Sequence, residues 1–290
     1  MPIIVGSPRS GTTLLRLMLD SHPEMAIPPE TGFLPAAQKL EGKGNELRER
    51  FFEMIVTFPA SAPAWGDFQI RKEAFHARLE EIRPFSIADG FRLFYRMYAA
   101  RFGKARWGDK TPLYCQHLPY LQDLLPEARF IHLVRDGRDA AVSLREQRFS
   151  PGFGIETQAR HWRDNVAAAR RDGPNCRHFL EVRFEDLVQD PETGLRRICG
   201  FVDLEYHPDM LRFPERAPGR LEEHRTRYRT DGSVLVSQED RRRQQAHVQN
   251  PLDASKIGIW RQALSEEEAR RFEEIAGDLL GAYGYPLLSR

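Results

Sequence analysis

The sequence predicts an α/β fold in three layers, with a central parallel sheet flanked by helices. Short apolar segments alternate along the chain with longer segments that have helical periodicity. Several of the apolar segments have almost no polar side, as expected for strands that are covered on both faces. With 290 residues, of which 41% are hydrophobic, the chain can form one substantial core. We therefore expect a single domain over residues 1–290.

Four segments have the composition of strands, because β-branched and aromatic residues favour extended structure. The first, at 3–5, consists of two isoleucines and a valine. ARW at 105–107 is a short candidate. ARFIHLV at 128–134 is the strongest strand in the chain, and HFLEVRF at 178–184 is a further buried strand.

Helical periodicity covers most of the remaining chain. The clearest case is FRLFYRMYAARF, in which apolar residues recur at i, i+3, i+4 and i+7. SIAD, at Ser86 to Asp89, precedes it with the spacing of a capping box. Proline opens the helices that begin at Pro112 and Pro191, where its missing N–H costs nothing. The expected helices lie at 12–21, 35–57, 73–102, 112–125, 137–148, 156–172, 191–202 and 265–283.

The segment at 214–254 differs from the rest of the chain. It is highly charged, has little periodicity, and contains RAPGR, RTDGS and EDRRRQQ. A long irregular segment inside a compact domain is usually functional or disordered. We expect a surface excursion here, either a lid over a site or a solvated insertion without a role.

Composition excludes several classes of protein. Lys plus Arg is 43 and Asp plus Glu is 42, so bulk charge does not indicate a nucleic-acid or membrane partner. No apolar run approaches the roughly 20 residues of a membrane span, and no signal-peptide pattern precedes the first strand. The three cysteines are widely spaced without a CxxC motif, which argues against a disulfide framework or a zinc site. A cytoplasmic location is expected.

The turn after the first strand is the most informative motif. GSPRSGTT spans Gly6 to Thr13 and leads directly into a helix. Glycine at each end of the turn allows a close backbone approach, and inward N–H groups beside a helix N-terminus form a cradle for a phosphate. The spacing is P-loop-like, but Thr12 stands where a nucleoside-triphosphate loop has lysine, and the cation, Arg9, lies inside the loop. The motif indicates one of two structures. It is either a phosphate site that lacks the lysine used to bind a metal-bound triphosphate, or a tight turn with no ligand.

A second motif follows the strongest strand. FIHLVRDGRDAAVS carries Arg135 at the strand end and Ser143 eight residues later, so a guanidinium and a hydroxyl can hold one phosphate from two sides. Together with PRSGTT, this resembles the sulfotransferases that use 3′-phosphoadenosine-5′-phosphosulfate (PAPS) as donor. The sequence is most similar to the branch that contains the protein-tyrosine sulfotransferases and many bacterial relatives, and the resemblance spans nearly the whole chain in order. Its other segments are RSGTTLLRLMLDSHPEM followed by ET, WGDKTP, VRFEDLV and PLDASKIGIW.

The resemblance implies a donor site divided between the two ends of PAPS. The N-terminal turn would hold the 5′-phosphosulfate, and Arg135 with Ser143 would hold the 3′-phosphate. Phe184 matches a tyrosine near the adenine in relatives, and Ser255 and Lys256 would add contacts to the 3′-phosphate. The product would be 3′,5′-adenosine bisphosphate (PAP), and no metal is required. The donor-binding residues so implied are Ser7, Arg9, Ser10, Gly11, Thr12, Thr13, Arg135, Ser143, Phe184, Ser255 and Lys256.

The resemblance also implies in-line transfer of the sulfuryl group to an acceptor hydroxyl. Glu30, in IPPETG, matches the general base of the tyrosine-sulfotransferase branch, and Lys110, in WGDKTP, matches a lysine that stabilises the transferring group. Arg9 and the loop amides would take up charge on the leaving phosphate. One departure concerns the acceptor, since Gly32 stands where the tyrosine-specific enzymes have arginine. Cytosolic members use a histidine base, so the competing candidates are His117, His132, His161 and His178.

The expected function is therefore PAPS-dependent sulfation of a small molecule, glycan or peptide. The expected partner is an acceptor substrate that bears a hydroxyl group; no nucleic acid and no membrane span are expected, and a homodimer is compatible with the sequence. Two other classes stay open. One is a P-loop kinase or nucleoside triphosphatase, and the other is a nucleotide-binding relative that kept the fold and lost the chemistry.

Overall fold

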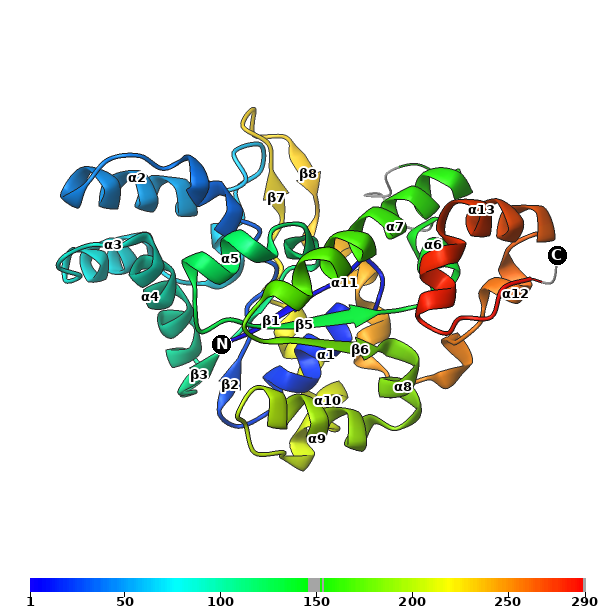
Figure 1. Cartoon of the computed structure of the whole chain (residues 1–290). Coiled ribbons are helices and arrows are strands. Elements are labelled where there is room, and N and C mark those ends of the chain that lie inside the picture. The colour runs from blue at the N-terminus through cyan, green and yellow to red at the C-terminus, as the bar shows by residue number, and fades with distance from the viewer. Residues whose placement is uncertain (146–151, 153, 289–290) are drawn as a thin grey trace.

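The computed structural model describes residues 1–145, 152 and 154–288 (Figure 1). Its central sheet has four parallel strands in the order β4-β1-β5-β6. These are β4 (Asp109–Lys110), β1 (Pro2–Val5), β5 (Arg129–Val134) and β6 (Phe179–Arg183). The parallel sheet predicted from the apolar segments is confirmed. The two strands that precede the predicted phosphate motifs, β1 and β5, are neighbours in its middle.

Helices cover both faces of the sheet, as the strand composition predicts. Ile3 and Val5 pack into one apolar cluster, whereas Ile4, on the opposite face of β1, packs into another. Because side chains alternate along a strand, this division gives β1 a buried environment on each side. In Figure 1, α5 (Leu118–Leu124) and α7 (Ile155–Asp172) lie above the sheet. Below it lie α1 (Thr12–Asp20), α9 (Pro191–Phe201) and α10 (Phe213–Leu221).

The helices on these two faces follow the predicted segments closely. On the lower face lie α1 (Thr12–Asp20), α8 (Phe184–Gln189) and α9 (Pro191–Phe201). On the upper face and at its end lie α5 (Leu118–Leu124), α7 (Ile155–Asp172), α6 (Gly137–Arg145), α12 (Trp260–Ala263) and α13 (Glu266–Ala282). The last residues of the helix predicted at 137–148 fall outside the described residues.

Two long predicted helices are interrupted. The segment at 35–57 divides into the 3-10 helix η1 (Leu34–Lys39) and α2 (Gly44–Thr57), and the segment at 73–102 divides into α3 (Lys72–Glu80) and α4 (Ile87–Ala100). Ser86 is the N-cap of α4, and its hydroxyl oxygen accepts a hydrogen bond from the Asp89 N–H at 3.1 Å, as the capping-box spacing predicts. The segment at 112–125 divides in the same way into η3 (Pro112–Gln116) and α5, because a second proline occupies position 119.

The smaller elements connect these layers. The strand predicted at 105–107 is β3 (Arg106–Trp107), which pairs in parallel with β2 (Met25–Ala26) in a separate two-stranded sheet. The remaining short helices are η2 (Trp65–Phe68), η4 (Gly173–Asn175), η5 (Pro208–Met210) and η7 (Ala254–Lys256). Within the part of the chain that the structure describes, no helix combines the length and apolar character needed to cross a bilayer.

The segment at 214–254 corrects the expectation of an irregular excursion. It contains α10 (Phe213–Leu221), a hairpin of β7 (Arg227–Tyr228) and β8 (Val234–Val236), α11 (Gln238–Gln244) and η6 (Ala246–Gln249). Its charges are not all solvated. Arg220, Glu223 and His224 are buried. Asp20 and Arg16, both from α1, pair with Arg220 and Glu223, and the Arg241 guanidinium contacts the His224 ring. The charge pattern of this segment therefore did not predict its ordered elements or its buried residues.

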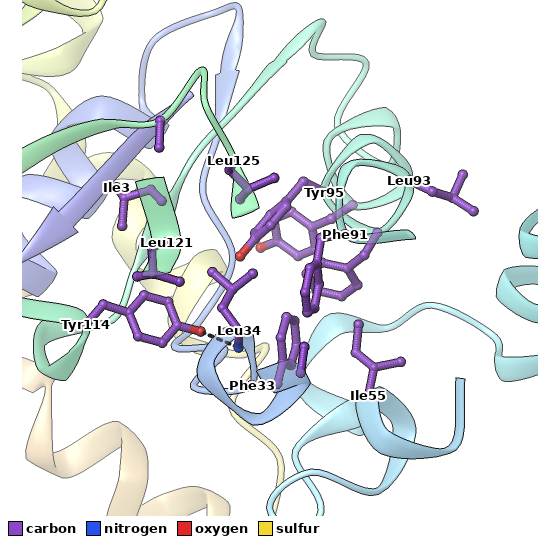
Figure 2. Close-up of a cluster of buried hydrophobic side chains, with 14 of the residues drawn as sticks. Ile3, Phe33, Leu34, Ile55, Phe91, Leu93, Tyr95, Tyr114, Leu121 and Leu125 are labelled. Atoms are coloured by element: carbon purple, nitrogen blue, oxygen red, sulfur yellow. Dashed lines mark hydrogen bonds between the residues drawn. The ribbon is translucent and has the colours of Figure 1, made fainter. Parts of the chain in front are cut away.

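An aromatic core supports the residues that follow Glu30. Phe33 stacks on Phe91, with ring centroids 5.6 Å apart and an interplanar angle of 5°. The Leu34 N–H donates to the Tyr114 hydroxyl at 3.1 Å, and Figure 2 shows this hydrogen bond beside the Phe33 and Phe91 rings. The chain downstream of Glu30 is thus fixed to a buried cluster from α4 and η3.

Candidate functional site

The N-terminal loop has the geometry that its glycines predict. It begins where β1 ends, and the backbone φ is +155° at Gly6, +70° at Arg9 and +90° at Gly11. A Cβ at Gly6 would lie 2.5 Å from the Leu133 carbonyl oxygen, so only glycine lets the loop leave the sheet here. Gly11 is the N-cap of α1 and supplies no side-chain cap, which leaves the first N–H groups of α1 for a ligand or solvent.

The polar side chains of the loop are buried around these N–H groups. Ser7, Ser10 and Thr12 are exposed by only 2%, 0% and 4%. The Ser10 hydroxyl is buried without a hydrogen-bond partner among the described residues. Buried polar atoms are normally paired, so this hydroxyl fits a loop that binds a polar ligand.

The structure brings the loop and the end of β5 together. The Arg9 Nε donates to the Ser143 hydroxyl at 3.0 Å, which joins the loop to α6. The Arg135 Nη1 donates to the Arg9 carbonyl oxygen at 3.3 Å. The convergence of Arg9, Arg135 and Ser143 that the two motifs predict is therefore present, because the carboxyl ends of neighbouring parallel strands share one edge.

The Phe184 ring contacts both the N-terminal loop and Arg135. It lies at the start of α8, directly after β6, and is 7% exposed. A Cβ on Gly11 would lie 2.4 Å from its Cδ2 atom, so the ring packs directly on the loop. The Arg135 guanidinium lies over the same ring, 4.6 Å from its centroid.

The chain at 253–260 closes the far side of this group. The Arg135 Nη2 donates to the Lys256 carbonyl oxygen at 2.9 Å, whereas the Lys256 and Ser255 side chains are exposed. Sequence reasoning missed Asp139, whose carboxylate accepts hydrogen bonds from the N–H groups of Gly258 at 2.7 Å and Trp260 at 2.9 Å. Its only sequence signal is its place in the VRDGRDAAVS motif, four residues after Arg135.

Glu30 and Lys110 meet beside the start of α1. The Lys110 Nζ donates to the Glu30 Oε1 at 2.5 Å and to the Thr13 hydroxyl at 3.2 Å. The Lys110 side chain is 2% exposed and that of Glu30 is 53% exposed. Burial lowers the pKa of Lys110, and the Glu30 carboxylate opposes that shift. Two of the three residues to which the resemblance gave a catalytic role, Glu30 and Lys110, are therefore in contact.

A buried network, missed by sequence reasoning, sits behind this pair. The Thr31 hydroxyl donates to the Asp109 Oδ2 at 2.7 Å, and the Tyr95 hydroxyl donates to the same oxygen at 2.7 Å. Burial raises the pKa of Asp109, which is fully enclosed. The neighbours Glu30 and Thr31 thus bond to the neighbours Lys110 and Asp109, so two pairs of contacts join the ET and GDK segments.

The competing histidines lie elsewhere. His132 is fully buried in β5, and its Nδ1 is 3.0 Å from the Glu181 Oε1. Burial lowers the pKa of His117 and His161. None of the hydrogen bonds of the described residues joins a histidine to Glu30 or Lys110. No group of three or more potential metal ligands occurs within the described ranges.

Comparison with known proteins identifies the family. The model of the sulfotransferase family matches residues 3–208. A Caenorhabditis briggsae protein provisionally named a protein-tyrosine sulfotransferase is 25% identical over 288 residues, which cover 97% of this chain and 87% of that protein. Nodulation protein NoeE of Sinorhizobium fredii is 30% identical over 307 residues, which cover 97% of this chain and 65% of NoeE. The chain thus spans less than two thirds of the length of NoeE.

Solved structures with the same fold are also sulfotransferases. The sulfotransferase domain from the curacin biosynthetic pathway matches with a TM-score of 0.61 at 20% identity, covering 99% of this chain and 98% of that domain. A mouse sulfotransferase solved with PAP matches with a TM-score of 0.50 at 14% identity, covering 96% and 83%. At these identities the likeness concerns the fold. The family model, by contrast, spans more than half of the chain, and the protein belongs to the sulfotransferase family of enzymes.

Proposed function

We propose that this protein transfers a sulfuryl group from PAPS to a hydroxyl group of an acceptor, with Glu30 as the general base. The observation that carries the proposal is the contact of Lys110 with both Glu30 and Thr13, at 2.5 and 3.2 Å. It joins a partly exposed carboxylate to the first turn of the helix that follows the anion loop. A base and an anion site within the reach of one lysine suit group transfer between a bound anion and a neighbouring hydroxyl.

The loop and the end of β5 fit a donor with two phosphate-type groups. The Ser10 hydroxyl, which has no hydrogen-bond partner in the described part of the chain, and the first N–H groups of α1 suit the 5′ end of the donor. Arg135 and Ser143 suit the 3′-phosphate, and Phe184, whose ring lies under the Arg135 guanidinium, would lie near the adenine. Mouse sulfotransferase solved with PAP shares this fold, which supports the choice of a bisphosphorylated adenosine.

In this mechanism the protein stabilises negative charge on the reacting groups and accepts one proton from the acceptor hydroxyl. The donor supplies the sulfuryl group, which bonds to the acceptor oxygen as its bond to the donor phosphate breaks. Glu30 takes the acceptor proton; its Oε2 has no hydrogen-bond partner among the described residues, and the side chain is half exposed. The buried Lys110 ammonium stabilises negative charge between base and donor, and Arg9 with the loop N–H groups stabilises the leaving phosphate.

The acceptor is proposed to be other than peptidyl tyrosine. Gly32 has a φ of +69°, and a Cβ there would lie 3.1 Å from the Phe58 ring. An arginine at this position, as in the tyrosine-specific enzymes, would be both strained and crowded. Small molecules and glycans with a free hydroxyl are therefore the first acceptors to assay, with tyrosine peptides as the comparison.

Two measurements test the proposal. Isothermal titration with PAP should give saturable binding without added metal, and absence of binding at millimolar PAP would refute the donor assignment. Labelled PAPS should then be assayed with phenols, saccharides and tyrosine peptides. Glu30→Gln should lower turnover by about 100-fold or more, since general-base catalysis contributes about 10²–10⁴. Glu53→Gln, an exposed glutamate on α2, is the matched control and should change nothing.

The two alternatives make different predictions. A P-loop kinase would bind ATP with magnesium, but Thr12 occupies the place of the phosphate-binding lysine and is only 4% exposed. A non-catalytic relative would bind PAP and transfer nothing to any acceptor. Full activity in Glu30→Gln would leave sulfuryl transfer intact and remove Glu30 as its base.

A further inference from the structure

We propose that Arg220, from the charged segment at 214–254, is a positioning residue for the Glu30 carboxylate. It acts through Ile27, three residues before Glu30, in a buried cluster that we call the Ile27 clamp: Arg16, Asp20 and Arg220. The inference rests on the proposed function, because it assigns what holds the proposed base in place.

Side chains, rather than a strand or helix, hold the Ile27 backbone. The Ile27 N–H donates to the Asp20 Oδ1 at 2.8 Å. Its carbonyl oxygen accepts from the Arg16 Nε at 2.9 Å and from the Arg220 Nη2 at 3.2 Å. Three charged residues, each no more than 8% exposed, therefore fix both the N–H and the carbonyl group of Ile27.

Arg220 is itself fixed from several sides. Its Nε lies 2.7 Å from the Asp20 Oδ2, and its Nη1 lies 3.0 Å from the Glu223 Oε1. Its Nη2 also donates to the Tyr98 hydroxyl at 2.6 Å. The planar guanidinium meets these acceptors together, a geometry that an ammonium group cannot reproduce.

The short chain between Ile27 and Glu30 is stiff. Pro28 and Pro29 fix their own φ angles and pass the position of Ile27 on to Glu30. On the other side of Glu30, the Thr31 hydroxyl is bonded to the buried Asp109 at 2.7 Å. The segment that carries Glu30 is therefore held on one side at Ile27 and on the other at Thr31. Removal of the clamp releases this segment at Ile27.

The clamp is separate from the donor loop. The loop leads into the N-terminal end of α1, at Thr12, whereas Arg16 and Asp20 extend from its middle and its last turn. None of the contacts of Arg220 among the described residues reaches the loop at 6–11. Loss of Arg220 should thus disturb the proposed base while donor binding is retained. This assigns the charged segment a clamping role in place of the lid or solvated insertion that its sequence suggested.

The test compares Arg220→Met with Arg216→Met. Arg216 is the matched control, because it lies on the same helix and donates to the carbonyl oxygen of Ser21, the C-cap of α1, at 2.7 Å. None of its hydrogen bonds among the described residues reaches Ile27. Arg220→Met should lower kcat by at least tenfold and leave the Kd for PAP within about twofold, a selective loss expected when a reacting group is misplaced. Arg216→Met should leave both unchanged, and Arg220→Lys should recover part of kcat. An equal loss of PAP affinity would overturn the proposal.

A double-mutant cycle separates positioning from general destabilisation. If Arg220 acts through the base, Arg220→Met should add little to the loss already caused by Glu30→Gln. The same fold-loss in both backgrounds would show that Arg220 acts elsewhere. If Glu30→Gln is fully active, Glu30 is not the base, and if the wild type transfers no sulfuryl group, the proposed reaction is wrong. Both results are distinct from failure of the clamp.

Hydrogen exchange tests the clamp without any activity. In the PAP-bound protein, Arg220→Met should speed amide exchange in the 25–31 segment and leave exchange in the 6–13 segment unchanged. Unchanged exchange at 25–31 would contradict the proposal. Should Arg220→Met not fold, Tyr98→Phe, which removes one acceptor of Arg220, should produce the same pattern to a smaller extent, and unchanged exchange there would count equally against the clamp.

Discussion

Substitution of Gly11 by alanine would place a methyl group against the ring of Phe184. Two costs follow from the structure. The backbone φ of +90° lies in the left-handed region, where a Cβ costs about 1–2 kcal/mol. The new Cβ would also lie 2.4 Å from the Phe184 Cδ2 and 2.6 Å from its Cε2. Crowding of this kind costs about 1–3 kcal/mol. The sum of the two ranges predicts a loss of about 2–5 kcal/mol in the free energy of unfolding.

Gly44 provides a control that separates the backbone cost of a Cβ from the steric cost of crowding. Its φ is +57°, and a Cβ there would meet nothing within 4 Å. Gly44→Ala should therefore cost only the backbone term, about 1–2 kcal/mol, and should leave PAP binding unchanged. Gly11→Ala should cost more and weaken PAP binding at least tenfold, because the loop and the Arg135 guanidinium both rest on the Phe184 ring.

Urea unfolding and isothermal titration with PAP measure these effects. In a Phe184→Ala background the ring is gone, so the extra cost of Gly11→Ala over Gly44→Ala should disappear. The reasoning is refuted if Gly11→Ala destabilises no more than Gly44→Ala in the wild-type background, or if the extra cost survives loss of the ring.

Other predictions concern the charged segment and the thiols. Asp67→Ala should cost about 3–5 kcal/mol by urea unfolding, because the fully buried carboxylate pairs with two guanidinium groups at 2.6 and 2.8 Å. Burial lowers the pKa of His224 to about 3, so the unfolded chain binds an extra proton below its ordinary pKa of 6.5. Stability should therefore fall by about 2 kcal/mol from pH 7 to pH 5, and His224→Gln should flatten that slope. Burial raises the pKa of Cys115 to about 12 and of Cys176 to about 11. An alkylating reagent should modify the half-buried Cys176 before the fully buried Cys115. Mass spectrometry measures the order of modification, and the reverse order would contradict the prediction.

The parts of the site that short motifs carry could be predicted from sequence. The glycines of the N-terminal turn, and Arg135 with Ser143, belong to strand–turn–helix units whose geometry is local. Once the strands are parallel neighbours, their carboxyl ends must share an edge, so Arg9 and Arg135 had to meet. The contact between Glu30 and Lys110 was not local, and only the resemblance to the family placed both in one mechanism.

The charged segment marks the limit of such reasoning. Its arginines have the spacing of a solvated surface, and nothing in the local pattern distinguishes Arg220 from the exposed Arg216 of the same segment. The partners that bury Arg220 include Asp20, which is 200 residues away in sequence. Burial of a charge depends on whether a counter-charge arrives in space, and periodicity carries no information about that.

By itself the sequence determined the alternation of apolar and periodic segments, and hence a parallel sheet with an anion loop after its first strand. Those features depend on side-chain period and on the conformational freedom of glycine, which act over a few residues. The tertiary structure alone decided which charges became buried, with Asp109 behind the Glu30 segment and Arg220 on Ile27. The physical reason is that the free energy of a buried ionisable group is set by the groups that surround it, and those came from four distant parts of the chain.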